Sequence, residues 1–471
     1  MKRRYLYAAA LAAVSLLGVF AHQQLWPVRW APGILSTAGM MSAYQPGDEL
    51  LGGAATVLDS GTTAYGRSLG NIAAEHWPSF YHGRGRFSRE WDQVKETRIQ
   101  PLGPLFSAVG CERCHEKDGR GKPLVGEVSE SMTVHLSVPG PHGTWIPDPV
   151  YGGQLDLYGV DGMRGEGILR VQYSRVTGDF ADGSSYTLMQ PKYELEHLAY
   201  GSLSPGARFS ARVAPANFGL GLLEAIPEQQ IVANADPDDR NADGISGRTG
   251  AAIDIRSGRP VLGRFGWKAT QPTIEQQVAR AFIMDLGITS SLYPHNGSNG
   301  TLVRHAAAAE PELDANDLRL MVAYVRLLAV PRQRGWDRHE VQRGRAIFRG
   351  IGCESCHIAN FTTGTVTDLP ELSNQVIHPY TDLLLHDMGA GLADDRPDGG
   401  ASGSEWRTPP LWGIGLLGRV SGHTRLLHDG RARNIEEAIL WHGGEAAHSQ
   451  EMYRRLTESD RAAVLEFLGS L

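Results

Sequence analysis

Cysteine is scarce in this chain of 471 residues, which has four, all of them within two pentapeptides. So few cysteines exclude a fold held together by disulfides, and a chain of this length does not need one. A basic excess is also missing, because 52 acidic residues outnumber 45 basic ones and the formal net charge is −7. We therefore expect no general binding of nucleic acid. With 41% apolar and 21% charged residues, the composition is that of a globular protein.

Long apolar runs are equally rare, and the one that stands out lies at the N-terminus. It extends from Leu6 to Ala21, follows Lys2-Arg3-Arg4, and ends with Val19-Phe20-Ala21. A basic segment, an apolar segment and small residues at −3 and −1 are typical of a secretory signal peptide, here residues 1–21. The run is short for a membrane span, which needs roughly 20 residues, although an uncleaved anchor is the alternative. We expect an exported, periplasmic protein with no stable membrane span in its mature chain.

The cysteines define two copies of one motif, Cys-x-x-Cys-His. These copies are Cys111, Cys114 and His115, and Cys353, Cys356 and His357. This is the attachment motif of c-type haem, because positions i, i+3 and i+4 share one face of a helical turn. Two thiols then form thioethers with the haem vinyl groups while the histidine reaches the iron. Zinc sites, redox-active Cys-x-x-Cys pairs and strained disulfides do not need a histidine after each pair. The sequence predicts two covalently bound haem c groups with His115 and His357 as proximal ligands.

Three matched pairs of segments indicate an internal duplication. Residues 104–111 match 345–353, residues 212–223 match 407–417, and residues 266–278 match 429–439, in the same order. The predicted fold is therefore mainly α, with two tandem cytochrome-c-like haem domains at 22–334 and 335–471.

The first half is longer than the second. Cys111 and Arg212 are 101 residues apart, whereas Cys353 and Arg407 are 54 apart. The extra stretch holds two alternating segments on either side of Gly178-Asp-Phe-Ala-Asp-Gly183. Such a pattern predicts a β-hairpin insertion that enlarges the first domain.

Further motifs carry a resemblance to a known family. These motifs are residues 236–247, residues 380–389, His428-Asp-Gly430, and Trp441-His-Gly-Gly444. Together with both haem motifs they resemble the bacterial diheme c-type oxidoreductase family, whose members are called peroxidases or thiol oxidoreductases. That family is related to the diheme cytochrome c peroxidases, and the resemblance covers most of the chain from Leu102 onward. The thiol label gains no support here, because attachment of both haems leaves no free cysteine.

The sixth iron ligands decide which haem does chemistry, because an iron with both axial positions filled moves electrons and an open one binds small molecules. In diheme peroxidases a methionine follows the His-Asp-Gly start by about 14 residues, and here that position is His442. The resemblance thus implies His442 as distal ligand of the second haem. A surface or helix-capping histidine, or ligation by Met388, is the alternative. The aligned position in the first module is Ala281, which cannot ligate iron and predicts an open or exchangeable site.

Other histidines, such as His82 and His197, remain alternative ligands for the first haem. Peroxide cleavage needs an acid–base group beside the open face of the iron. Glu224 is the predicted catalytic residue, since its counterpart in the second module is Gly418, and Gln277 is predicted to assist with a hydrogen bond. A helix-end charge or a partner for Arg212 is the alternative role for Glu224.

A calcium loop is predicted where Asp239, Asn241 and Asp243 alternate before Gly244. Alternating side-chain oxygens before a glycine turn suit Ca²⁺, although the glutamate that ends an EF-hand loop is replaced by Gly250. A solvated acidic turn is the alternative. The resemblance implies calcium as well, because diheme peroxidases carry this ion near the interface of their haems.

The predicted function is that of a periplasmic diheme c-type cytochrome oxidoreductase. We expect it to reduce hydrogen peroxide at the N-terminal haem, with electrons relayed by the C-terminal haem from a small redox-protein donor. Two alternatives remain at this stage. One is a diheme electron-transfer protein without a substrate of its own, and the other is a diheme oxidase of a protein or organic substrate.

Overall fold

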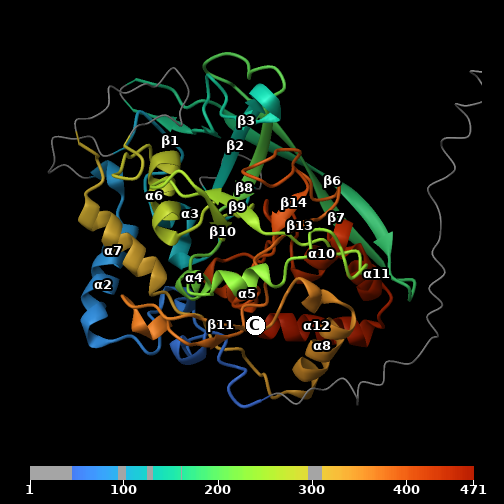
Figure 1. Cartoon of the computed structure of the whole chain (residues 1–471). Helices are drawn as coiled ribbons and strands as arrows, with labels where there is room; N and C mark the ends of the chain where they lie inside the picture. Colours follow the sequence, from blue (N-terminus) through green and yellow to red (C-terminus); the bar gives the residue numbers. More distant parts are fainter. Residues whose placement is uncertain (1–44, 94–101, 125–130, 161, 295–309) are drawn as a thin grey trace, which may run out of the picture. The chain divides into compact units, whose positions relative to one another are not determined.

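The computed structural model describes residues 45–93, 102–124, 131–160, 162–294 and 310–471 (Figure 1). The predicted signal peptide, residues 1–21, lies outside these ranges. Residues 41–471 form one compact unit, and the domain boundary between 334 and 335 stays a prediction. Within the described ranges, none of the helices has both the length and the apolar character that crossing a membrane would require.

Helices surround the two Cys-x-x-Cys-His motifs, and the first motif is itself a helical turn. The α-helices are α2 (Trp77–Phe87), α3 (Cys111–Cys114), α4 (Leu220–Glu224), α5 (Glu228–Val232), α6 (Ile274–Asp285), α7 (Ala315–Arg326), α8 (His339–Gly350), α9 (Leu417–Val420), α10 (Ile435–Leu440), α11 (Ala447–Arg454) and α12 (Glu458–Ser470). Short 3-10 helices include Glu116–Asp118, Cys353–Ser355, Ile414–Leu416 and Gly444–Ala446.

Strands overturn the expectation of a mainly α fold, since the structure is 31% helical and 19% strand. The strands are β1 (Leu105–Phe106), β2 (Met132–Pro139), β3 (Trp145–Ile146), β4 (Gln154–Leu155), β5 (Tyr158–Gly159), β6 (Ile168–Asp179), β7 (Ser185–Glu196), β8 (Arg208–Val213), β9 (Gly250–Ile253), β10 (Pro260–Gly263), β11 (Phe361–Thr362), β12 (Val376–Ile377), β13 (Leu385–Asp387) and β14 (Glu405–Arg407). Most are too short to show a sequence period, because two or three residues cannot display an alternation.

The sheet around β2 is the main element that the prediction missed. β2 pairs antiparallel with β3, β4 and β8, and residues of β2, β4 and β8 share an apolar core with Leu124 and Tyr151. The sequence of β2 alternates from Met132 to Leu136, with its apolar side chains buried. This alternation is the expected mark of a half-buried strand. The first half therefore contains a sheet as well as the predicted hairpin.

The hairpin consists of β6 and β7, which pair antiparallel from Ile168 opposite Glu196 to Asp179 opposite Ser185. Figure 1 shows these two long strands running toward α11. At the tip, the amide of Ala181 donates to the carbonyl of Arg454 at 3.0 Å. The hairpin thus joins the inserted stretch of the first half to the last helices of the second half.

The helices pack in two groups. In the first, α7 lies against α2, α4 and α6, and in the second, α12 lies against α8 and α10. A single apolar core continues through both groups, from Leu51 to Leu471. Side-chain caps fix several helix starts: Thr273 caps α6, Asp314 caps α7 and Thr457 caps α12.

Candidate functional site

A cavity of about 440 Å³ lies between the two groups of helices, and both Cys-x-x-Cys-His motifs open into it. Cys114 and His115 border it from the first motif, and Cys353, Cys356 and His357 from the second. A smaller cavity of about 90 Å³ adjoins Cys111 and His115. Residues more than 200 positions apart in the sequence therefore face one interior space.

Each motif forms the helical turn that haem attachment requires. The amide of His115 donates to the carbonyl of Cys111 at 2.9 Å, and the amide of His357 donates to that of Cys353 at 3.0 Å. An aromatic ring accompanies each histidine in the same geometry. Phe87 lies 6.3 Å from His115 and Phe348 lies 6.3 Å from His357, with interplanar angles of 49° and 52°. The two halves thus build matching environments around their histidines.

The ring nitrogens of both proximal histidines suit metal ligation. His357 shares a hydrogen bond of 2.9 Å between Nδ1 and the carbonyl of Tyr380, which fixes the tautomer and leaves Nε2 for the iron. Nδ1 of His115 is buried without a hydrogen-bond partner and lies near the backbone carbonyls of Pro215 and Gly119. Burial lowers the pKa of both imidazoles to about 4, so they are neutral, as metal ligands must be.

His442 borders the same cavity as His357. Its Nδ1 lies 2.6 Å from the carbonyl of Ala438, so Nε2 is again the nitrogen left for the cavity. Burial lowers the pKa of His442, and a charge on its ring would also disfavour a charge on His357, as expected of two rings that border one cavity. Met388 borders the cavity as well. Both candidate ligands are in reach, and the assignment of His442 stays a prediction.

Helix α6 forms the wall of the cavity beside the first motif. Gln277 and Ala281 border both cavities, together with His115. The structure therefore brings the predicted residue Gln277, and the alanine without ligating capacity, to the first motif. The alternative ligands His82 and His197 are exposed at the surface and do not border either cavity.

Glu224 has a different environment. Its Oε1 accepts a hydrogen bond from the amide of Ile274 at 2.8 Å, and its Oε2 pairs with Arg326 at 2.9 Å. The carboxylate thus satisfies a free amide at the start of α6 and lies outside the residues that border the cavity. Its catalytic role stays a prediction that no contact of the structure supports, and Arg212 is not its partner.

In the predicted calcium loop, the side-chain oxygens accept hydrogen bonds from the loop itself. Asp239 Oδ1 accepts from the amides of Asp243 and Gly244 at 3.0 and 3.2 Å. Asn241 donates from Nδ2 to Asp243 Oδ2 at 3.0 Å. These Asx-type contacts shape a tight turn, and calcium binding by Asp239, Asn241 and Asp243 stays a prediction.

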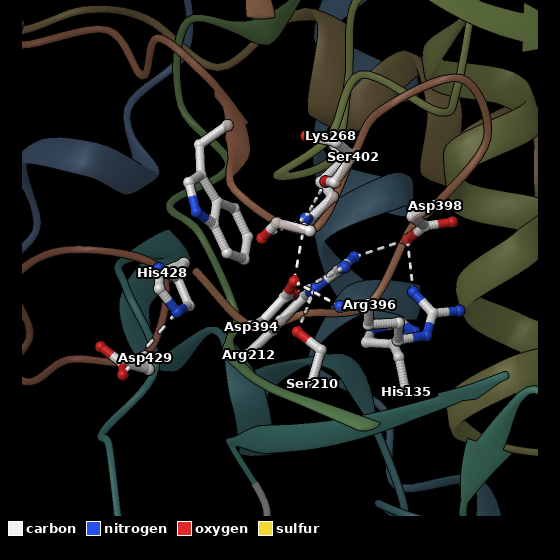
Figure 2. A network of polar contacts seen from close by, with 12 residues as sticks. His135, Ser210, Arg212, Lys268, Asp394, Arg396, Asp398, Ser402, His428 and Asp429 are labelled. Carbon is white, nitrogen blue, oxygen red and sulfur yellow. Dashed lines mark hydrogen bonds and ion pairs between the residues drawn. The ribbon is translucent and has the colours of Figure 1, made fainter. Parts of the chain in front are cut away.

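A network of buried charges lies beside the cavity, which two of its members, Arg212 and Asp398, border (Figure 2). Arg212 pairs with Asp398 at 2.7 Å, and Lys268 pairs with Asp394 at 3.0 Å. Arg396 also reaches Asp398, at 2.8 Å. The three cations and two carboxylates leave one net positive charge in a largely buried place. Sequence reasoning missed the network, because its members come from β8, the segment after β10 and the loop before β14.

Beside this network, His428 stacks on Trp406 with ring centroids 3.8 Å apart and an interplanar angle of 8°. Lys268 Nζ lies 4.2 Å from the centroid of the same tryptophan. Burial lowers the pKa of His428 to about 3, so the ring is neutral. The imidazole of His428, the first residue of the His-Asp-Gly motif, is therefore uncharged and packs against Trp406 at the cavity wall.

A second polar group lies next to Cys356. His386 holds Asp382 at 2.8 Å through Nε2 and Glu445 at 2.7 Å through Nδ1, and its Nδ1 is 3.7 Å from Cys356 Sγ. Burial alone lowers the pKa of His386, but the hydrogen bonds with Asp382, Cys356 and Glu445 outweigh it and raise the value to about 12. Glu445 also accepts from Ser246 Oγ at 2.8 Å, which ties the end of the predicted calcium loop to this group.

The residues that border the cavity fit a pair of haems. The second motif presents two thiols and a neutral histidine to the larger cavity, and the first presents Cys114 and His115 there and Cys111 to the smaller one. Trp267, Trp406 and Trp412 supply apolar walls. Four arginines border the cavity, namely Arg120, Arg212, Arg280 and Arg407, against the carboxylates Asp285, Asp398 and Glu445. This positive excess suits the propionates that a haem carries.

Comparison with known families decides the assignment. The model of the family described as "Di-haem oxidoreductase, putative peroxidase" matches residues 47–471. The chain belongs to the di-haem oxidoreductase family. This confirms the resemblance predicted from the motifs, and the two haems of the family correspond in number to the two Cys-x-x-Cys-His motifs. No curated protein matches the sequence.

Proposed function

We propose that this di-haem oxidoreductase is a c-type peroxidase that reduces hydrogen peroxide at the haem of the first motif. The observation that carries the proposal is an asymmetry of the cavity. The cavity wall near His357 includes His442, whereas the aligned position on α6 is Ala281, which borders the space beside His115 together with Gln277. An iron with two axial ligands transfers electrons and an iron with an open position binds small molecules, so this difference suits one haem of each kind.

The chain offers matched residues for each cofactor. Cys111, Cys114 and His115 would hold the first haem, and Cys353, Cys356, His357 and His442 the second. Bound haem iron supplies the redox chemistry, because an open axial position takes peroxide and a filled pair of positions passes electrons. The overall reaction consumes one peroxide, two electrons and two protons and yields two waters. A small redox protein is the proposed source of the electrons.

The protein's own groups contribute binding and exclusion of water. Gln277 offers an amide to a peroxide oxygen at the wall beside His115. Phe265 and Trp267 border the same space, and the indole of Trp267 is fixed by a hydrogen bond of 2.8 Å from Nε1 to the carbonyl of Val213. These rings keep bulk water from the reacting oxygens. We propose a periplasmic location, supported by the predicted signal peptide and by haem attachment outside the cytoplasm.

The decisive experiment compares the wild type with Ala281→His and, as control, Ala281→Gly. Optical and EPR spectra of the ferric and half-reduced proteins are recorded before and after addition of peroxide. We expect a high-spin signal that responds to peroxide in the wild type and the glycine variant, and its loss in the histidine variant. Two low-spin haems in the wild type, inert to peroxide in both states, would instead indicate an electron carrier.

A further inference from the structure

The C-terminal residue of α6 approaches the first haem motif more closely than its place in the sequence indicates. The backbone carbonyl of Asp285 accepts hydrogen bonds from the amides of Ser107 and Ala108 at 2.8 and 3.1 Å, and that segment leads directly into Cys111. The side chain of Asp285 borders both cavities, together with Gln277 and Ala281 on the same helix. A carboxyl group therefore belongs to the α6 wall of the space beside His115.

A buried glutamine holds this carboxyl group. Gln154 on β4 donates from Nε2 to Asp285 Oδ1 at 2.9 Å and to the carbonyl of Met284 at 2.9 Å. Gln154 is 1% exposed, and its register partner on β2 is His135. Because directly paired residues point to the same face of a sheet, β2 and β4 present both side chains to α6. The sheet that the sequence analysis missed thus positions the carboxyl group.

The surroundings of Asp285 suit a group that gains and loses a proton near neutrality. Burial raises its pKa to about 6, while the hydrogen bond from Gln154 and the charge of Arg280 on α6 act in the opposite direction. The other ionisable groups that face it are Asp156, at the end of β4, and Cys111 on α3. An acid–base catalyst works best when its pKa is close to the working pH.

We propose that Asp285 is the catalytic acid–base residue of the first haem and that Gln154 is its positioning residue. This assignment rests on the proposed peroxidase function and goes beyond it. Glu224, the residue predicted for the role, has both carboxylate oxygens engaged away from the cavity. Asp285, in contrast, borders the cavity beside His115 and Gln277.

The proposed step moves one proton within the bound peroxide. The carboxylate of Asp285 would accept the proton of one peroxide oxygen and return it to the other, which would leave as water when the O–O bond breaks. Over the whole reaction, one peroxide takes up two electrons from the redox-protein donor and two protons from solvent and yields two waters.

The test uses the haem-loaded protein with Asp285→Asn, the conservative Asp285→Glu, and Glu275→Gln as matched control. Glu275 lies on the same helix, half-exposed and paired with Arg256 at 2.8 Å. We expect Asp285→Asn to lower the rate constant of the reaction with peroxide by about 10²–10⁴-fold. In this variant the rate constant is also expected to lose its dependence on pH, which has a midpoint near 6 in the wild type. Asp285→Glu is expected to restore part of the rate. Glu275→Gln is expected to change neither the rate constant nor its pH dependence.

A spectroscopic readout keeps the test independent of turnover. Infrared difference spectra between pH 5 and pH 7 are expected to show a carboxyl carbonyl band in the wild type that is absent in Asp285→Asn. Gln154→Leu is expected to shift the pH midpoint upward, because the carboxylate loses a hydrogen bond, while both haems stay attached. If Asp285→Asn does not retain both haems, the shift of the pH midpoint in Gln154→Leu decides whether Asp285 is the acid–base residue.

The outcomes separate the two proposals. A wild type inert to peroxide overturns the proposed function and this assignment with it. A reactive wild type overturns only the assignment if Asp285→Asn reacts at the same rate with the same pH profile. An unchanged pH midpoint in Gln154→Leu likewise overturns the positioning role of Gln154.

Discussion

The guanidinium carbon of Arg461 lies 3.9 Å from the ring centroid of Phe180, and this contact joins the tip of the inserted hairpin to α12. Arg461 also pairs with Asp182 at 2.9 Å, and Phe180 packs on Tyr186 at 5.1 Å between centroids. A cation above an aromatic face is a favourable contact that gains strength when shielded from water, and Phe180 is 8% exposed. Contacts at the tip of the hairpin therefore hold the two halves of the chain together.

Phe180→Ala is expected to lower the free energy of unfolding by about 3 kcal/mol, because it removes a buried ring and its contact with Arg461. Urea denaturation followed by haem absorbance measures the change. Val176→Ala, at an exposed position of the same hairpin, is the control and should change the stability little. Equal stability of Phe180→Ala and wild type would contradict a stabilising contact between the hairpin and α12.

Replacement of His442 tests the ligand set of the second haem. His442→Ala is expected to convert this haem from low spin to high spin, since an alanine cannot ligate iron. His442→Met should raise the haem's reduction potential by on the order of 100 mV, because a thioether favours the reduced iron more than a second imidazole does. EPR and a spectroelectrochemical titration measure the two effects. A low-spin haem that persists in His442→Ala and is lost in Met388→Leu would assign the ligand to Met388 instead.

Glu166 makes stability depend on pH. Burial and the neighbouring Asp156 raise its pKa to about 9, so the folded chain keeps a proton that the unfolded chain releases near pH 4.5. Between these values the free energy of unfolding falls as pH rises, by up to about 1.4 kcal/mol per pH unit. Glu166→Gln removes this fall in the free energy of unfolding, because glutamine does not titrate. The variant is therefore expected to be more stable than the wild type at pH 8.5 but not at pH 4.

Urea denaturation of both proteins at the two pH values is the measurement. Glu194→Gln serves as control, because Glu194 is a solvent-accessible carboxylate on β7, paired with Lys192 at 2.6 Å. A constant difference in stability between Glu166→Gln and wild type at both pH values would refute the raised pKa.

Glu224→Gln is expected to destabilise the protein by about 1 kcal/mol, since it removes the charge that pairs with Arg326 and weakens the contact with the Ile274 amide. Thermal unfolding of the haem-loaded protein gives the change. A large loss of peroxide reactivity at unchanged stability would restore the catalytic role predicted from the sequence.

The sequence predicts the two Cys-x-x-Cys-His motifs and the candidate iron ligands better than the parts of the fold that position them. Cys111 to His115 and Cys353 to His357 are recognisable because haem attachment imposes a fixed local spacing. His442 follows from the resemblance to diheme peroxidases and Ala281 from the duplication, and both border the cavity. These features are local or repeated, so a single chain displays them without an alignment.

Asp285 and Gln154 show why other parts of the site could not be predicted from the sequence. No local pattern marks either residue, because their contact joins the end of a helix to a strand of two residues. The prediction of a mainly α fold failed for the same reason, since β4 is defined by its partner β2 and not by a period of its own. Glu224 was chosen for its place beside a glycine-rich repeat, whereas its contacts are with Ile274 and Arg326.

The size of the shared cavity has a consequence for how the two halves of the chain pack. If nothing filled this space of about 440 Å³, its apolar walls, Trp267, Trp406 and Trp412 among them, would lack packing partners, and missing contacts of this kind lower stability. Haems bound there would supply these contacts and act as part of the core. Because both halves of the chain face the one space, loss of either haem is expected to weaken the packing of both.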